Sequence, residues 1–178
     1  MKILVTGGAG YIGSILVPTL LSLNNEITVI DNFMYKQSSL NQICFNKNFK
    51  IINGDIRDSN LMREQIAAND VVIPLAAIVG APLCKKDPYT ADSVNSQAIK
   101  NMLKLVSKNQ FILMPTTNSA YGTGDKNNFC DENSELKPIS KYAIDKVEIE
   151  KLLMDRENSI SYRLATVFGM SPRMRIDL

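Results

Sequence analysis

Six short runs of apolar, β-prone residues are spread along the chain, and their length and composition are typical of strands. The fourth run is almost wholly apolar, as expected for a strand covered on both faces of a parallel sheet. The predicted strands are Met1–Thr6, Glu26–Ile30, Phe49–Asn53, Val71–Ala76, Phe111–Pro115 and Ser161–Phe168.

Between these runs, apolar residues recur at helical spacing. The predicted helices are Tyr11–Leu23, a segment capped by Asp58 or Ser59 that continues to Ala67, Tyr89–Ser107, and Pro138–Arg156. The segments expected to be mainly irregular are Phe33–Asn48 (with a short helix near Ser38–Cys44), Gly80–Asp87 and Thr116–Pro138. Strands that alternate with helices predict an α/β fold, a doubly wound parallel sheet with helices on both faces.

The composition narrows the class of protein. A chain of 178 residues, 45% hydrophobic and 21% charged, suits one globular domain. The net charge of +2, without a basic run, gives no reason to expect nucleic acid. The longest mainly apolar stretch, Val71–Cys84, is too short to cross a bilayer and contains two prolines, so no membrane partner is expected. Three scattered cysteines indicate reduced thiols in a cytoplasmic protein.

Histidine is absent from the sequence. This excludes Ser-His-Asp triads, Cys-His pairs and histidine-ligated metals, and we expect no metal site. Any acid–base chemistry must therefore use other side chains, such as tyrosine, lysine or carboxylates.

A glycine-rich turn joins the first predicted strand to the first predicted helix. Gly7, Gly10 and Gly13 remove Cβ atoms where the backbone must turn tightly, approach a pyrophosphate or pack closely. The N–H groups at the start of the helix would then face the anion. The pattern indicates a dinucleotide site, although an ordinary turn between strand and helix can have the same spacing.

Asp31 ends the second predicted strand, 18 residues after Gly13. A carboxylate at about this distance accepts hydrogen bonds from the adenosine ribose and would repel a 2′-phosphate. Asp31 therefore favours NAD over NADP. The alternative interpretation is a turn or capping aspartate in the Asp31-Asn32 pair.

Tyr142 and Lys146 are four residues apart in the last predicted helix, so they share one face. A lysine ammonium and a bound nicotinium ring would both favour the tyrosine phenolate, which can remove a proton from a sugar hydroxyl. The lysine can also hold the nicotinamide ribose. The alternative is a solvated Tyr–Lys pair on an exposed helix face.

Eight sequence motifs resemble those of the extended short-chain dehydrogenase/reductases and occur in the same order along the chain. This family includes NAD-dependent nucleotide-sugar epimerases and dehydratases. The resemblance covers nearly the whole chain and implies a Rossmann-type fold with NAD as cofactor. The motifs are TGGAGYIGS (Thr6–Ser14), Asp31, GDIRD (Gly54–Asp58), LAAIVG (Leu75–Gly80), VN (Val94-Asn95), TTNSAYG (Thr116–Gly122), YAIDK (Tyr142–Lys146) and RLATVFG (Arg163–Gly169).

The resemblance also implies residue roles. Thr117 would hydrogen-bond the substrate oxygen, Tyr142 would be the acid–base and Lys146 its partner. Asn95 would help to place the active-site helix. The residues implied to contact the cofactor are Gly7, Gly10, Tyr11, Ile12, Gly13, Asp31, Asn32, Asp55, Ile56, Leu75, Ala76, Ala77, Asn95, Tyr142 and Lys146.

The two residues that follow Thr117 differ from those of the dehydratases and decarboxylases in that family. The 4,6-dehydratases carry an Asp-Glu pair there, and the sugar-acid decarboxylases tend to carry Glu at the second position. Here the residues are Asn118 and Ser119, which cannot act as carboxyl acids or bases. The sequence therefore favours epimerisation, in which a nucleotide sugar is oxidised to a keto intermediate and the hydride returns to the other face. An NAD(P)-dependent reductase or dehydrogenase and a non-catalytic dinucleotide-binding module remain as alternatives.

The chain is short for this family, whose members usually exceed 300 residues. We expect residues 1–170 to form the NAD-binding domain and residues 171–178 to begin a truncated substrate region. Arg173 and Arg175 could pair with a sugar-nucleotide diphosphate, or could lie in a frayed, solvated tail. A homodimer through the Tyr–Lys helix and the long helix before it is expected by analogy alone.

Overall fold

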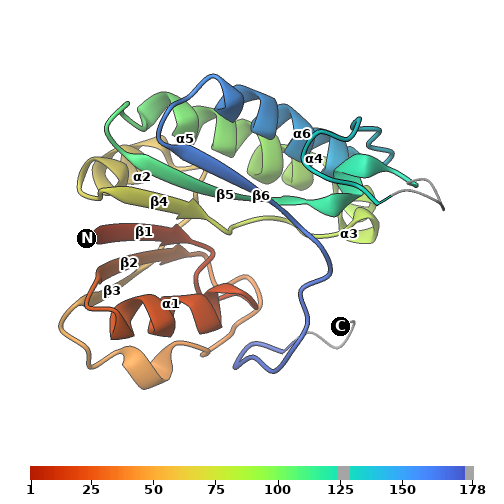
Figure 1. The fold of residues 1–178 in the computed structure, drawn as a ribbon. Coiled ribbons are helices and arrows are strands. Elements are labelled where there is room, and N and C mark those ends of the chain that lie inside the picture. Colours follow the sequence, from red (N-terminus) through yellow and green to blue (C-terminus); the bar gives the residue numbers. More distant parts are fainter. Residues whose placement is uncertain (124–128, 175–178) are drawn as a thin grey trace.

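The computed structural model describes residues 1–123 and 129–174. These residues form a parallel sheet of six strands in the order β3-β2-β1-β4-β5-β6 (Figure 1). The strands are β1 (Lys2–Thr6), β2 (Glu26–Asp31), β3 (Phe49–Asn53), β4 (Val71–Pro74), β5 (Phe111–Thr117) and β6 (Ser159–Leu164). The direction of winding reverses between β1 and β4, which opens a crevice beyond their carboxyl ends. The predicted fold class is confirmed.

Helix α1 (Gly13–Ser22) covers one face of the sheet, over β1 and β2 (Figure 1). Val17 and Leu21 of the helix pack onto Val5 and Val29 of these strands, and all four side chains are buried. The helix starts at Gly13 instead of Tyr11, because Tyr11 and Ile12 belong to the glycine-rich turn. This places the start of α1 at the crevice.

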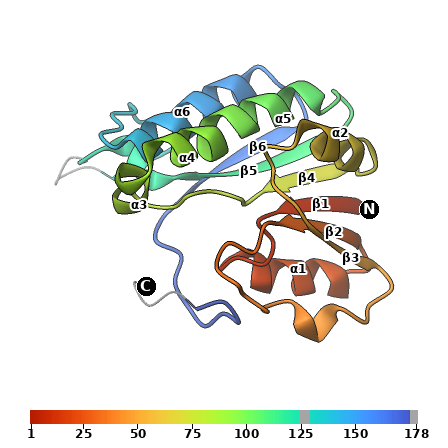
Figure 2. The same ribbon diagram turned by 180° about the vertical axis from the view of Figure 1, so that it is seen from behind.

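The other face carries α2 (Ser59–Ala67), α4 (Pro88–Asp92), the π-helical turn η2 (Ser93–Ala98), α5 (Ile99–Leu105) and α6 (Lys141–Met154), as Figure 2 shows from behind. The apolar side chains of these helices bury those of the sheet in one core that includes Leu4, Ile30, Val72, Ile112, Met114, Ile149 and Leu153. Asp58 caps α2 through its carboxylate, which accepts from the backbone N–H groups of Asn60 and Leu61. Both faces are therefore covered by helices, although unequally.

One segment that the sequence predicts as loop is helical. Residues Ala81–Lys86 form α3, directly after Gly80, whose φ of +89° turns the chain. Gly80 and Pro82 led to the wrong prediction, because both residues commonly interrupt helices. In the first turn of a helix, however, proline has the backbone angle that the helix needs.

Other boundaries differ from prediction because tertiary contacts decide them. The single long helix predicted over Tyr89–Ser107 is divided by the π-helical turn η2. The last strand ends at Leu164, which pairs with Thr117, the last residue of β5. The β-prone residues after Leu164 have no neighbouring strand to pair with. Among the described residues, no helix is both long and apolar enough to cross a membrane.

Candidate functional site

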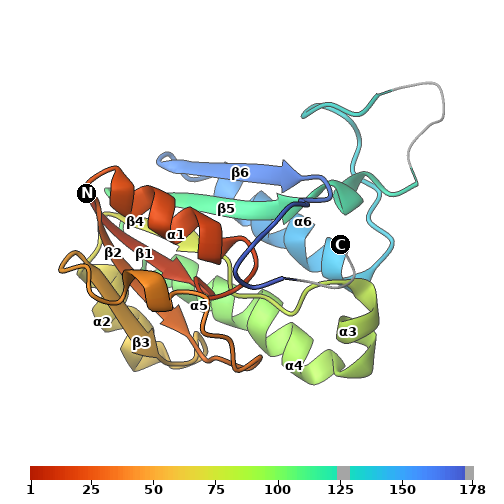
Figure 3. The same cartoon turned by 90° about the horizontal axis from the view of Figure 1, so that it is seen from below.

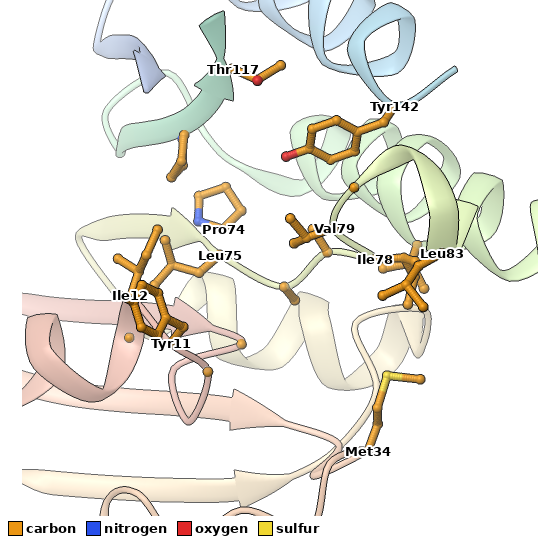
Figure 4. A pocket seen from close by; sticks show the side chains of 18 of the residues that line it. Tyr11, Ile12, Met34, Pro74, Leu75, Ile78, Val79, Leu83, Thr117 and Tyr142 are labelled. Atoms are coloured by element: carbon orange, nitrogen blue, oxygen red, sulfur yellow. The ribbon is translucent and has the colours of Figure 1, made fainter. Parts of the chain in front are cut away.

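A cavity of about 860 Å³ lies beyond the carboxyl ends of the strands (Figure 4). Its walls come from segments that follow β1, β2 and β3 on one side and β4, β5 and β6 on the other. The predicted site residues that line it are Gly7, Gly10, Tyr11, Ile12, Gly13, Asp31, Asn32, Asp55, Ile56, Leu75, Ala76, Ala77, Thr117, Tyr142 and Lys146. One cavity thus brings together the glycine-rich turn and the Tyr–Lys pair.

The glycine-rich turn has no room for side chains at two of its glycines. Gly7 has a φ of +67°, and a Cβ there would lie 2.6 Å from Cα of Ala76. A Cβ at Gly13 would lie 2.4 Å from the backbone oxygen of Gly8. Ile12 occupies the N-cap position of α1 and supplies no side-chain acceptor. The N–H groups of Ser14 and Ile15, which a serine or aspartate cap would engage, donate instead to the carbonyls of Gly10 and Ile12 at 2.9 and 3.1 Å. Within the described residues, the N–H groups of Ile12 and Gly13 have no hydrogen-bond partner, which suits an anion such as a pyrophosphate.

Asp31 joins the turn to the loop after β2. It is 7% exposed, and its carboxylate accepts from the backbone N–H of Ala9 at 3.0 Å, the backbone N–H of Phe33 at 2.9 Å and the side-chain amide of Gln37 at 3.2 Å. The residue therefore combines the turn role weighed from the sequence with a place in the cavity wall. Its predicted contact with a ribose remains a prediction.

Asp55 lies on the wall that follows β3. Arg57 donates to both carboxylate oxygens, at 2.9 and 2.6 Å, and this hydrogen bonding is the main reason why the pKa of Asp55 is lowered. Arg57 also donates to the hydroxyl of Ser93 in η2 at 3.3 Å. The ion pair of Asp55 and Arg57 holds this wall of the cavity against η2, and its two charges largely cancel.

Asn95 does not line the cavity, unlike the other predicted site residues. Its buried amide accepts from the N–H of Ile78 and donates to the carbonyl of Ile78, both at 2.9 Å. Ile78 follows Leu75, Ala76 and Ala77, which do line the cavity. Asn95 therefore holds the segment after β4 in place from behind.

The predicted catalytic residues lie at the other end of the cavity. Figure 4 shows the hydroxyl of Tyr142 directed into it, with Thr117 nearby at the end of β5. Lys146 is 4% exposed, donates to the carbonyl of Pro115 at 3.2 Å and lies 6.0 Å from the centroid of the Tyr142 ring. The Tyr–Lys pair therefore faces a cavity and not solvent.

Burial changes the chemistry of Lys146. Loss of solvation lowers the pKa of its ammonium to about 8, while the charge of Asp145 opposes this shift. A lysine with this pKa is mostly charged at neutral pH, and so it can favour a phenolate beside it. The hydroxyl of Thr117 accepts from the N–H of Ser119 at 3.1 Å, which orients its own proton away from that bond.

Several cavity-lining residues were not predicted from the sequence: Met34, Tyr35, Gln37, Arg57, Val79, Leu83, Ser140 and Met174. Most lie in loops whose position depends on the folded sheet. Ser140 could have been found, because it caps α6 by accepting from the N–H of Ala143 at 3.2 Å. Among residues 1–123 and 129–174, no cluster of three or more Cys, Asp or Glu side chains could hold a metal ion.

The segment after β6 returns toward α1 (Figure 3). Thr166, Val167, Arg173 and Met174 of this segment line the cavity. The hydroxyl of Tyr11 donates to the carbonyl of Gly169 at 2.6 Å, and the hydroxyls of Ser14 and Ser171 lie 2.7 Å apart. Arg173 lies over the ring of Tyr35, 4.5 Å from its centroid. This arginine is thus not in a frayed tail, whereas Arg175 lies outside the described residues.

Comparison with known proteins fits this geometry. Residues 3–176 match the family described as "NAD dependent epimerase/dehydratase family". The chain belongs to this family. It is 34% identical to the UDP-N-acetyl-alpha-D-glucosaminuronate decarboxylase of Bacillus cytotoxicus over 124 residues, 69% of this chain and 38% of that protein. It is 32% identical to the uncharacterised UDP-glucose epimerase YtcB of Bacillus subtilis, over all of this chain and 60% of that protein.

A solved structure agrees with both sequence matches. The UDP-glucuronic acid 4-epimerase of Bacillus cereus, in complex with NAD, matches with a TM-score of 0.86 and 28% identity, over all of this chain and 60% of that one. The chain thus spans between 38% and 60% of the length of these relatives. The relatives include epimerases, decarboxylases and dehydratases, so the family alone does not assign one reaction.

Proposed function

We propose that this chain is the NAD-binding and catalytic part of an NAD-dependent nucleotide-sugar epimerase. The observation that carries the proposal is the single cavity lined by the glycine-rich turn and Asp31 at one end and by Thr117, Tyr142 and Lys146 at the other. The proposal is supported by membership of the family and by similar proteins whose names include NAD or a nucleotide sugar.

The two ends of the cavity have separate tasks in this proposal. The first turn of α1 and Asp31 bind the pyrophosphate and the adenosine ribose, and the segment Leu75–Ala77 lies alongside the cofactor. NAD supplies a hydride acceptor that later returns the hydride. Tyr142 removes the proton of the sugar hydroxyl, Lys146 stabilises its phenolate, and Thr117 holds the substrate oxygen.

The residues after Thr117 favour epimerisation over elimination or decarboxylation. Asn118 and Ser119 line the same cavity and carry an amide and a hydroxyl, not carboxyl groups. Neither side chain can supply the acid–base pair that loss of water needs. Reversible oxidation and reduction at one carbon, with bound NAD as the hydride acceptor, would require no acid–base groups beyond the Tyr–Lys pair and Thr117.

Product analysis with candidate nucleotide sugars and NAD tests this proposal. We expect interconversion of sugar epimers, measured by NMR, with no net gain in the absorbance of reduced cofactor. Net formation or use of reduced cofactor would instead assign a dehydrogenase or reductase, and loss of water or carbon dioxide would assign the other branches of the family.

Tyr142→Phe provides the matched control for that assay. We expect it to abolish turnover and to leave NAD affinity nearly unchanged, because the hydroxyl alone is removed. If NAD binds to the parent chain but no candidate sugar is turned over, the non-catalytic binding module becomes the better interpretation.

The three free cysteines support a cytoplasmic location, and a homodimer remains a prediction.

A further inference from the structure

The segment Gly169–Met174, named the strap here, contacts both sides of the cofactor end of the cavity. Its first contact is with the start of α1: Ser171 is 8% exposed, and its hydroxyl donates to the carbonyl of Tyr11 at 2.9 Å besides meeting Ser14. Its second contact is with the loop after β2, where Arg173 stacks on Tyr35. The strap therefore bridges the glycine-rich turn and the loop that follows Asp31.

Arg173 differs from the other cations in the lining. Arg57 is paired with Asp55, and Lys146 is buried at the catalytic end. Within the described part of the chain, Arg173 forms no ion pair, and one of its guanidinium nitrogens donates to the carbonyl of Met174 at 2.9 Å. Stacking on the flat face of a tyrosine ring leaves the in-plane N–H groups of a guanidinium available to an anion.

The position of the strap identifies which anion this would be. Ser171 lies against Tyr11, in the turn where the N–H groups of α1 begin. Arg173 is two residues further on, a distance of at most about 7 Å along an extended chain. A phosphate bound at the start of α1 would thus lie within reach of its side chain.

We propose that the strap closes the cofactor site and that Arg173 binds the pyrophosphate of the dinucleotide from the side opposite the start of α1. The inference rests on the proposed function, since it concerns the same cofactor. It also revises the expectation that this arginine serves a sugar-nucleotide diphosphate, because Arg173 lies on Tyr35 beyond Asp31 and Asn32. The pyrophosphate is then held by backbone N–H groups below and a guanidinium above.

Calorimetric titration of the chain with four ligands tests the proposal without any assay of turnover. NAD and ADP-ribose carry the pyrophosphate, adenosine carries no phosphate, and NADP adds a 2′-phosphate. We expect Arg173→Met to weaken NAD and ADP-ribose by about tenfold or more, as for loss of a charge-assisted hydrogen bond, and to leave adenosine unchanged. Arg63→Met, which removes the same charge from the exposed surface of α2, should change none of these affinities.

Variants of the stacking partner give a second test. Tyr35→Phe keeps the aromatic face and should retain NAD affinity, whereas Tyr35→Ser should lower it in the same direction as Arg173→Met. Unfolding midpoints of all variants should stay close to that of the parent chain, since the strap lies outside both buried cores.

Three results would overturn the inference. These are an unchanged affinity for NAD in Arg173→Met, an equal loss for adenosine, or a loss confined to NADP, which would place the charge at a 2′-phosphate. Failure of the parent chain to bind any dinucleotide is a different result, and it would contradict the proposed function itself.

Discussion

At the scale of single residues, the environment of Lys146 matters most. Its ammonium is buried beside a backbone carbonyl, and burial lowers its pKa to about 8 from 10.5. The neighbouring Asp145 is 1% exposed and is paired with Lys141, which also contacts Asp92 of α4 at 3.1 Å. These ion pairs keep the carboxylate of Asp145 next to Lys146, and the negative charge helps the lysine to stay protonated.

We predict that Lys146 titrates near pH 8 in the folded protein. The measurement is NMR of protein labelled at lysine side chains, with the signal assigned by Lys146→Arg. Asp145→Asn should lower the midpoint, because the attraction of the carboxylate is lost. Glu148→Gln removes the same charge from an exposed position of α6, where Glu148 pairs with Lys100, and should leave the midpoint unchanged.

The lowered pKa of Lys146 also predicts how stability and turnover change with pH. Since the pKa of Lys146 is lower in the folded than in the unfolded chain, the unfolded chain binds more protons between pH 8 and 10.5. This group therefore adds stability as the pH rises through that range. Turnover should fall over the same range, because the ammonium beside Tyr142 is lost. A midpoint near 10.5 would contradict both expectations.

At the scale of elements, α6 is fixed to the sheet by a buried ionic network. Glu150 is 5% exposed and lies two turns after Tyr142 on the same side of α6. It accepts from Arg163 of β6 at 2.8 Å and from the hydroxyls of Thr116 and Ser161 at 3.1 and 3.2 Å. Arg163 also donates to the hydroxyl of Tyr121, beyond the end of β5, at 2.9 Å. The network ties the helix of Tyr142 to the strand that ends at Thr117.

We predict that Glu150→Gln destabilises the chain by roughly 2 kcal/mol, because it removes the charge that the partly buried guanidinium of Arg163 pairs with. Glu148→Gln, on the exposed side of the same helix, should cost less than about 1 kcal/mol. Urea unfolding of both variants measures the difference. Equal midpoints would show that the network does not hold α6 in place.

The sequence predicts these elements better than it predicts how they contact one another. Strand and helix periodicity located all six strands and the main helices, since those signals are local. Periodicity did not locate the buried face of α1, where Val17 and Leu21 are buried while Ile15 and Leu23 are exposed. The contact of Asn95 could not be predicted, because its side chain binds the backbone of Ile78, which is 17 residues away in the sequence. The pairing of Glu150 with Arg163 likewise requires the strand and helix to be packed first. The residues of the glycine-rich turn were predicted well because their spacing is set by steric limits within one short segment.

At the scale of the whole molecule, the sheet brings together residues that are far apart in the sequence. The reversal between β1 and β4 places Gly7–Gly13 and Tyr142 on one cavity, and the strap returns to Tyr11 across 158 positions of sequence. The boundary predicted at residue 170 falls inside this strap, which contacts Tyr11 and Ser14 near the start of the chain. The division into residues 1–170 and 171–178 therefore remains a proposal.

A crystal structure of this chain with NAD tests the proposed site most directly. We expect the pyrophosphate to lie at the N–H groups that begin α1, the adenosine ribose at Asp31, and the nicotinamide ring beside Tyr142 and Lys146. Nicotinamide bound away from Tyr142, or a dinucleotide bound outside this cavity, would contradict the proposed site.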